Sequence, residues 1–197
     1  MKKIVLSIIC ISALFMKPAS AQHNFYAFTY TMGFSSGDFN DFIGQGSFRG
    51  VTLDYRHMFK DNLGVGVEFG WNAWFEERDY ATYTDGTQSI SGKQFRYCST
   101  VPMLASANYF ILPGEKFNPY AGLGIGTMFS TSELDMGVWA FTDDTWHFLL
   151  KPEIGFVYEI NPGFGLTVSG KYYAAFETKE TLSRNYIAAN VGIAWGF

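Results

Sequence analysis

The chain has 197 residues, of which 48% are hydrophobic, 19% aromatic and only 16% charged. Its 14 Lys and Arg against 18 Asp and Glu give a net charge of −4, so it lacks the basic surface that nucleic-acid binding requires, and we expect no nucleic-acid partner. Beyond the N-terminus, no stretch has the roughly 18 consecutive apolar residues of a membrane helix. A membrane-spanning form of this chain would have to use strands.

The N-terminus has the pattern of a secretory signal peptide. Lys2 and Lys3 precede an apolar run over residues 4–16, and Ala19-Ser20-Ala21 follows as a small-residue cleavage site. The pattern predicts a signal peptide over residues 1–21, cleavage near Ala21 and a single mature domain over 22–197. Three of the 14 basic residues lie in the signal peptide, which leaves 11 basic against 18 acidic residues and a mature net charge of −7.

The mature sequence contains eight segments in which apolar and polar residues alternate, a period of two that is typical of β-strands. The third is the clearest, because apolar residues at every second position from Leu63 to Phe75 alternate with Gly, Glu and Asn. The fourth contains Pro102, which cannot donate a hydrogen bond to a neighbouring strand, so we expect a β-bulge there. The eight predicted strands are 25–34, 48–59, 63–76, 94–112, 119–129, 145–160, 164–176 and 186–197.

The connections between these strands alternate in length. Three short turns, at 60–62, 113–116 and 161–163, alternate with four longer loops, at 35–46, 77–93, 130–144 and 177–183. An even number of strands with alternating short and long connections is typical of outer-membrane barrels. The sequence therefore predicts an all-β fold, an eight-stranded antiparallel up-and-down transmembrane β-barrel.

The last strand resembles the C-terminal strand of bacterial outer-membrane barrels. Val191, Ile193, Trp195 and Phe197 place apolar side chains on one face, although an ordinary β-sandwich strand would show the same alternation. The resemblance implies that these four residues are the signal that the barrel-assembly machinery recognises.

Two further segments carry a family resemblance. The run 100–104 with Tyr109-Phe110, and the glycine-rich run 119–126, resemble the small outer-membrane β-barrel domain family, often called the porin family, whose architecture is similar to the OmpA and OmpX barrels. This resemblance implies a location in the bacterial outer membrane after signal-peptide cleavage, in contact with lipid and lipopolysaccharide. We expect a monomer.

The polar faces of the predicted strands carry both acidic and basic residues. The lumen of an eight-stranded barrel is just wide enough for side chains to fill it, and isolated buried charges are costly, so we expect these residues to pair. Glu68 and Arg96, on neighbouring strands, form one candidate pair. The alternative is a proton or ion path through the same residues. The predicted lumen network comprises Asp54, Arg56, Glu68, Arg96, Lys151, Glu153, Glu159 and Lys171.

The sequence offers little support for catalysis, a metal or another cofactor. His23, His57 and His147 fall at different heights or on different faces of the predicted barrel, so they do not predict a metal cluster. No Ser follows His147 by two residues, as the lipid A deacylase pattern requires, and no Asp-Ser pair matches the lipid A palmitoyltransferase. Cys98 is the only mature cysteine, which excludes an internal disulfide. We expect no catalytic site.

The four loops are acidic and contain aromatic residues. Simple solvation would explain the acids; alternatives are divalent cations shared with lipopolysaccharide, or a basic partner. Phe39, Phe42, Trp139 and Phe141 would be adhesive anchors or lie among the lipid headgroups. The acids are Asp38, Asp41, Glu77, Asp79, Asp85, Glu133, Asp135, Asp143, Asp144, Glu177 and Glu180, against Arg78, Lys93 and Lys179.

These features favour a structural or surface-binding outer-membrane protein, with any extracellular ligand bound through the acidic and aromatic loops. The alternative is a small passive pore, which the strand count and the charged lumen disfavour. A lipid-modifying enzyme is the third hypothesis.

Overall fold

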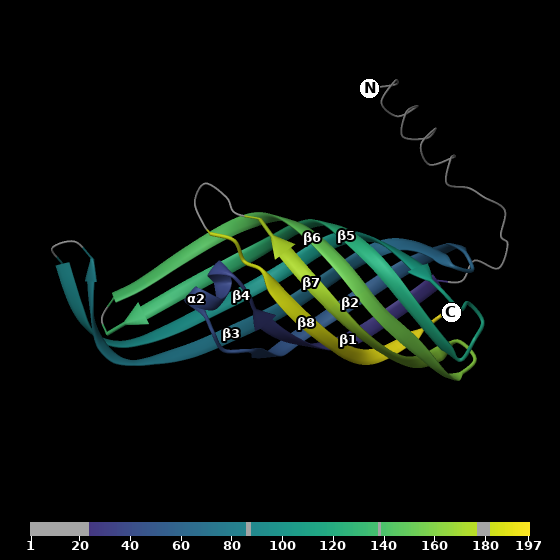
Figure 1. Ribbon diagram of the computed structural model, residues 1–197, viewed down its shortest axis with the longest axis horizontal. Coiled ribbons are helices and arrows are strands. Elements are labelled where there is room, and N and C mark those ends of the chain that lie inside the picture. Colours follow the sequence, from purple (N-terminus) through teal and green to yellow (C-terminus); the bar gives the residue numbers. More distant parts are fainter. Residues whose placement is uncertain (1–23, 86–87, 138, 177–181) are drawn as a thin grey trace, which may run out of the picture.

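The computed structural model describes residues 24–85, 88–137, 139–176 and 182–197. Eight antiparallel strands, each paired with its neighbours in sequence order, form a closed barrel in which β8 pairs with β1 (Figure 1). The predicted all-β barrel is therefore confirmed, whereas the predicted signal peptide and its cleavage site lie outside the described residues. The strands are β1 (Asn24–Ser35), β2 (Ser47–Lys60), β3 (Leu63–Asp85), β4 (Gln88–Phe110), β5 (Phe117–Met136), β6 (Trp139–Asn161), β7 (Phe164–Ala175) and β8 (Tyr186–Trp195).

The strands differ greatly in length, and this shapes the two ends of the barrel. The short turns at 60–62, 113–116 and 161–163 lie at one end, here called the turn end, together with the C-terminus (Figure 1). At the other end, the loop end, the hairpins β3–β4 and β5–β6 extend beyond β1, β2, β7 and β8.

Most of the predicted loops 77–93 and 130–144 are therefore strand, and that prediction was wrong. The pairing of β5 with β6 continues without a register shift to Met136 and Trp139. The loop prediction failed because both faces of these segments carry polar residues, so the hydrophobic alternation that marks a strand disappears although the backbone pairing continues.

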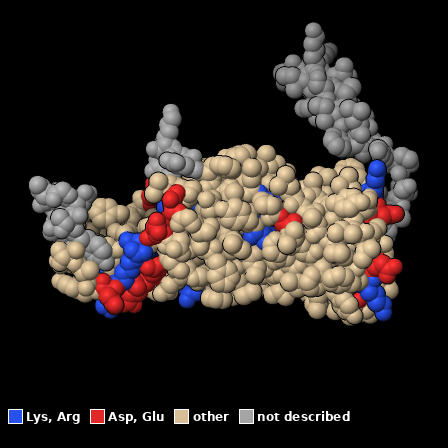
Figure 2. Space-filling view, in the orientation of Figure 1, with Lys and Arg blue, Asp and Glu red and all other residues tan. Residues whose placement is uncertain are grey.

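The outer surface of the barrel is apolar around its middle. On β3, Val65, Val67, Phe69 and Trp71 are 40–59% exposed, whereas Glu68 and Asn72 between them are 2% and 0% exposed. The predicted faces of this strand are therefore correct. In the view of Figure 2, acidic and basic side chains gather at the two ends and the surface between them is largely uncharged. This distribution is that of a lipid-facing band bounded by polar ends.

Pro102 does not cause the expected bulge. The pairs Phe69↔Met103 and Asn72↔Thr100 have the same register, and the pairing of Pro102 with Met128 on β5 is also regular. The ring fits because the residue across from it on β3 is Gly70, where an added Cβ would lie 2.9 Å from the Pro102 Cγ. A glycine opposite the proline thus accommodates the ring without an extra residue.

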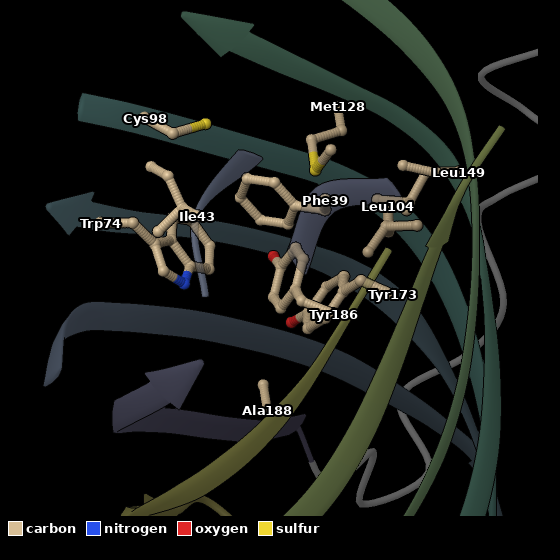
Figure 3. Packing of buried hydrophobic residues seen from close by; sticks show 11 residues of the cluster. Phe39, Ile43, Trp74, Cys98, Leu104, Met128, Leu149, Tyr173, Tyr186 and Ala188 are labelled. Carbon is tan, nitrogen blue, oxygen red and sulfur yellow. The ribbon is translucent and has the colours of Figure 1, made fainter. Parts of the chain in front are cut away.

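A short helix, α2 (Asp38–Phe42), fills the loop end of the lumen. Phe39 and the adjacent Ile43 are fully buried against Trp74, Tyr173 and Tyr186, with the rings of Phe39 and Trp74 5.1 Å apart (Figure 3). The prediction that Phe39 is an exposed loop aromatic was therefore wrong. No helix in the described parts of the chain is long and apolar enough to cross a membrane.

A second apolar cluster closes the turn end. Phe25, Phe110 and Tyr120 form its centre, and Phe197 packs against it with its ring 5.8 Å from that of Phe25. Phe197 was predicted to continue the outward row of β8, but the strand ends at Trp195 and Gly196 adopts φ +89°. This turn directs the last aromatic side chain into the barrel.

Candidate functional site

Between the two apolar clusters, six charged side chains form a closed ring of alternating sign. Arg56 bridges Asp54 (Nη2–Oδ1 3.3 Å) and Glu153 (Nη2–Oε1 3.2 Å), and Lys151 continues from Glu153 (Nζ–Oε2 2.7 Å) to Glu68. Lys171 closes the ring, with its Nζ 2.9 Å from Glu68 Oε2 and 3.2 Å from Asp54 Oδ2. Each charge therefore contacts two of the opposite sign, and the ring is neutral.

The six ring residues are at most 5% exposed, and aromatic side chains complete their contacts. Tyr120 donates a hydrogen bond to Glu153 (2.8 Å) and Tyr173 donates one to Glu68 (2.7 Å). The Arg56 guanidinium lies between two aromatic rings, 4.9 Å from the centroid of Phe25 and 4.8 Å from that of Tyr120. Cation–π contacts of this kind stabilise a buried guanidinium. The arrangement offsets part of the desolvation of the charges.

Glycines on β5 make room for this ring. The inward positions of β5 opposite β6 include Gly122, which pairs with Glu153, and Gly124, which pairs with Lys151. An added Cβ at Gly124 would lie 3.1 Å from Lys151 Cε. Two glycines of the run that carries the family resemblance therefore have a local packing reason in this barrel, since an added Cβ would crowd Lys151 at Gly124 and the Asn108 side chain at Gly122.

The structure brings together six of the eight predicted lumen residues, but not Arg96 or Glu159. The predicted pair of Glu68 with Arg96 is wrong, because the register of β3 and β4 places Glu68 opposite Leu104, and Arg96 opposite Glu76 near the loop end. Glu159 lies at the turn end, where its Oε1 accepts a hydrogen bond from the Gly163 N–H (3.1 Å).

Arg96 instead helps to hold α2 in place. Its Nη1 donates to the Phe42 carbonyl oxygen (2.7 Å), and Arg78 Nη2 donates to that of Asp41 (2.9 Å). Glu76 accepts from the Gly44 N–H (2.5 Å) and from Arg78 Nε (2.7 Å). Burial raises the pKa of Glu76, but these hydrogen bonds lower it more, so the net shift is downward. The base of the β3–β4 extension is thus bonded to the helix that closes the lumen.

A serine and a histidine, which sequence spacing did not connect, lie together inside the loop end. Ser130 Oγ on β5 is 3.0 Å from His147 Nε2 on β6, and the Phe176 carbonyl oxygen is 3.0 Å from His147 Nδ1. If Nδ1 donates to this carbonyl, Nε2 accepts from the serine, which is the hydrogen-bonding order of a nucleophile and its base. Spacing along one strand could not reveal a pair that joins two strands.

This pair is buried among the residues that the structure describes. Ser130 is 2% and His147 1% exposed, and their neighbours Met128 and Leu149 belong to the cluster that packs around Phe39. Its hydrogen bonds satisfy two polar groups in a packed interior. His57 lies far along the barrel, bonded to Asn24, and His23 is outside the described residues. Among the described residues, no three His, Cys, Asp or Glu side chains could hold a metal ion.

The extension of β3–β6 beyond the barrel is the other candidate site. Its acids outnumber its bases, and Tyr80, Trp139 and Phe141 are 69%, 58% and 55% exposed. Glu76 pairs with Arg78 and Glu77 with Lys93 (Oε1–Nζ 2.6 Å), whereas Asp79, Glu133 and Asp135 have no ion pair within the part of the chain that the structure describes. The predicted loop residues Glu177, Lys179 and Glu180 lie outside that part.

The comparisons with known proteins place the chain in a family. The family described as outer membrane protein beta-barrel domain matches residues 6–197, so the chain belongs to this family of β-barrel outer-membrane proteins. A comparison with curated protein sequences found no match.

Several solved structures share the fold. Neisserial surface protein A aligns with a TM-score of 0.54 at 16% identity, over 92% of this chain and 100% of that one. Ail, the attachment invasion locus protein of Yersinia pestis, aligns with a TM-score of 0.53 at 14% identity, over 89% of this chain and 97% of that one. The Ail structure was solved in complex with the heparin analogue sucrose octasulfate. A major outer membrane protein of Thermus thermophilus aligns with a TM-score of 0.53 at 13% identity, over 87% of this chain and 99% of that one. At these identities the likeness shows the fold alone.

Proposed function

We propose that this protein is a non-catalytic surface-binding protein of the bacterial outer membrane, anchored by its barrel and presenting the β3–β6 extension to a partner outside the cell. The observation that carries the proposal is the extension itself. Four strands continue past the barrel as a paired sheet with exposed aromatic side chains and unpaired acids. An ordered, exposed surface of this kind is the usual site of recognition on a rigid scaffold.

The interior of the barrel argues against the alternative of a passive pore. A solute would have to pass the cluster around Phe39, then the alternating ring, then the cluster around Phe25. Lys151 and Glu68 in the ring have fully buried side chains. An eight-stranded barrel is just wide enough for its own side chains, so these three layers favour a closed lumen over an aqueous path.

The charge of the extension indicates the kind of partner. Ail was crystallised with a polyanion, a heparin analogue. The extension of the present chain is acidic, with only Arg78, Lys93 and Arg96 as bases on β3 and β4 beyond Phe75 in the described residues. Electrostatic complementarity therefore favours a basic partner surface.

The proposal is tested by trimming the extension without touching the barrel. In one variant, residues 79–91 of the β3–β4 hairpin are replaced by a short turn; in a matched control, the turn at 113–116 of the opposite end is replaced. Both are expressed on the bacterial surface and screened against immobilised host and matrix proteins. We expect the first variant to lose binding and the control to keep it. Equal binding by both would reject the proposal.

The lipid-modifying alternative has its own measurement. The mass spectrum of lipid A from cells that overexpress the protein should be unchanged. A new lipid A mass that disappears in Ser130→Ala would instead make the buried Ser130–His147 pair a catalytic site.

A further inference from the structure

One edge of the extension is an unpaired strand. β2 pairs with β3 only as far as Gly50↔Asn72, whereas β3 continues to Asp85. The chain before β2 covers the next residues, through the bonds of Ser47 Oγ to the Ala73 carbonyl and of the Gly44 N–H to Glu76. From Glu77 to Thr82, no backbone partner lies on the side away from β4 among the described residues. We call this segment the β3 edge.

The β3 edge is already ordered as a strand in the absence of a partner. Its other side pairs with β4 at Glu77↔Phe95 and Arg78↔Gln94, and again at Ala81↔Gly92 and Thr82↔Ser91, with a register shift at Asp79 and Tyr80 between them. A hydrogen bond joins the Thr82 and Ser91 hydroxyls (2.8 Å). Arg78 fixes its base, through Glu76 and the Asp41 carbonyl. A preformed strand loses little conformational entropy on binding, which favours affinity. Six residues span roughly 20 Å, enough for a short added strand.

The side chains along this edge favour a basic partner. Glu77 pairs with Lys93 and Arg78 pairs with Glu76, whereas Asp79 is exposed and has no ion pair among the described residues. Tyr80 beside it is 69% exposed and offers an apolar contact. A lysine or arginine on an added strand would meet Asp79 across the edge, and opposite charges at facing positions stabilise strand pairing.

A second copy of this chain fits the edge poorly. Two barrels in one membrane have the same orientation, so β3 of one copy would meet β6 of the next in antiparallel fashion. The part of β6 beyond the barrel carries the acids Asp143 and Asp144 and no lysine or arginine, so its edge would bring charge of the same sign to the β3 edge. Like charges at facing positions destabilise the pairing, and charged edge strands commonly prevent self-association.

We propose that the β3 edge, Glu77–Thr82, binds an extended basic segment of another protein as an added β-strand. Backbone hydrogen bonds would supply affinity and Asp79 would select for positive charge, as in strand addition to other exposed sheet edges. This inference rests on the proposed surface-binding function and names the class of partner and the place of contact.

The test uses the full-length barrel folded in lipid nanodiscs and a fluorescent eight-residue peptide of alternating lysine and valine. A second probe has the same side chains but an N-methyl group on every backbone amide, so that it keeps its charge and has no backbone N–H on either side to donate to an edge. Fluorescence anisotropy gives the Kd for each. We expect the first peptide to bind and the methylated one to bind about tenfold more weakly or not at all.

Charge variants locate the contact. Asp79→Lys should weaken binding of the first peptide by about tenfold, whereas Asp144→Lys, an equal charge change on β6, should change it less than about twofold. Equal effects of the two variants, or equal binding of the two peptides, would overturn the inference. If trimming the hairpin abolishes partner binding on cells while these edge measurements fail, the proposed function stands and only the edge assignment is wrong.

Discussion

At the scale of single residues, the alternating ring sets the stability of the interior. Each member has two partners of opposite sign, so removal of any one leaves a buried charge without its counterpart. A buried pair is weak evidence for net stabilisation, but breaking one is costly because desolvation is no longer offset. The contribution of the ring to stability is therefore clearer from substitutions that break it than from a sum of its contact energies.

We predict that Glu68→Ala destabilises the barrel by about 3–5 kcal/mol, because it leaves Lys151 and Lys171 each with one carboxylate fewer. Urea unfolding in lipid vesicles measures the loss. The double variant Glu68→Gln with Lys171→Gln should recover part of it, with a clear coupling energy between the two sites. Glu68→Gln combined with Arg96→Gln is the matched control and should show no coupling. A coupling energy of zero between Glu68 and Lys171 would contradict their pairing in the ring.

A second residue-scale prediction concerns the C-terminus. Gly196→Ala should lower the yield of folded barrel, because φ +89° strains any other residue and an added Cβ would lie 2.1 Å from the Asn24 carbonyl oxygen. Phe197→Asp should lower it as well, by removing the aromatic that packs on Phe25. Heat-modifiable migration on a gel measures the folded fraction. Gly192→Ala is no control, since that site is also crowded; Gly170→Ala, with open space around it, should fold normally.

At the scale of elements, the sequence predicted the strands where lipid imposes a pattern and missed structure elsewhere. The eight strands and the faces of β3 follow from alternation, because lipid demands apolar residues on one face and the lumen accepts polar ones. Above the lipid band this demand ends, so the upper parts of β3–β6 did not appear in the pattern. Helix α2 was missed for another reason: five residues are too few for a helical period, and the burial of Phe39 depends on a cavity that only the closed barrel creates.

The lipid face gives an element-scale prediction. Phe69→Arg, in the apolar band of β3 beside Leu53 and Met103, should cost about 2–4 kcal/mol of folding free energy. Tyr80→Arg, on the same strand beyond the band, should change stability by less than about 0.5 kcal/mol. Urea unfolding of both in lipid vesicles compares them. Similar costs would mean that the lipid band has been placed wrongly. A lumen site would be a poor control, since Asn72 is fully buried.

At the scale of the whole molecule, the order of the strands was predictable from the sequence, but the height of each residue along the barrel axis was not. Neighbouring strands were correctly expected to be antiparallel, yet the shear of a barrel decides which residues share a level. Six predicted charges met in one ring because they lie at one level, while Arg96 and Glu159, of the same inward parity, lie at opposite ends. Periodicity gives the face of a residue, and only the register gives its height.

The last prediction tests whether the filled layers close the molecule. In planar lipid bilayers, the full-length barrel should give no steady single-channel openings. Phe39→Ala removes the side chain that fills the loop end, but it too should stay silent, because the ring and the cluster around Phe25 still block the lumen below it. Conduction would require all three layers to be opened, so brief openings are expected only when Glu68→Ala and Lys151→Ala are combined with Phe39→Ala and Phe25→Ala, provided that this variant folds by the gel assay. Steady openings of the unmodified barrel that persist in Lys151→Ala would mean that solutes pass by another route, and the passive-pore alternative would then replace the surface-binding proposal.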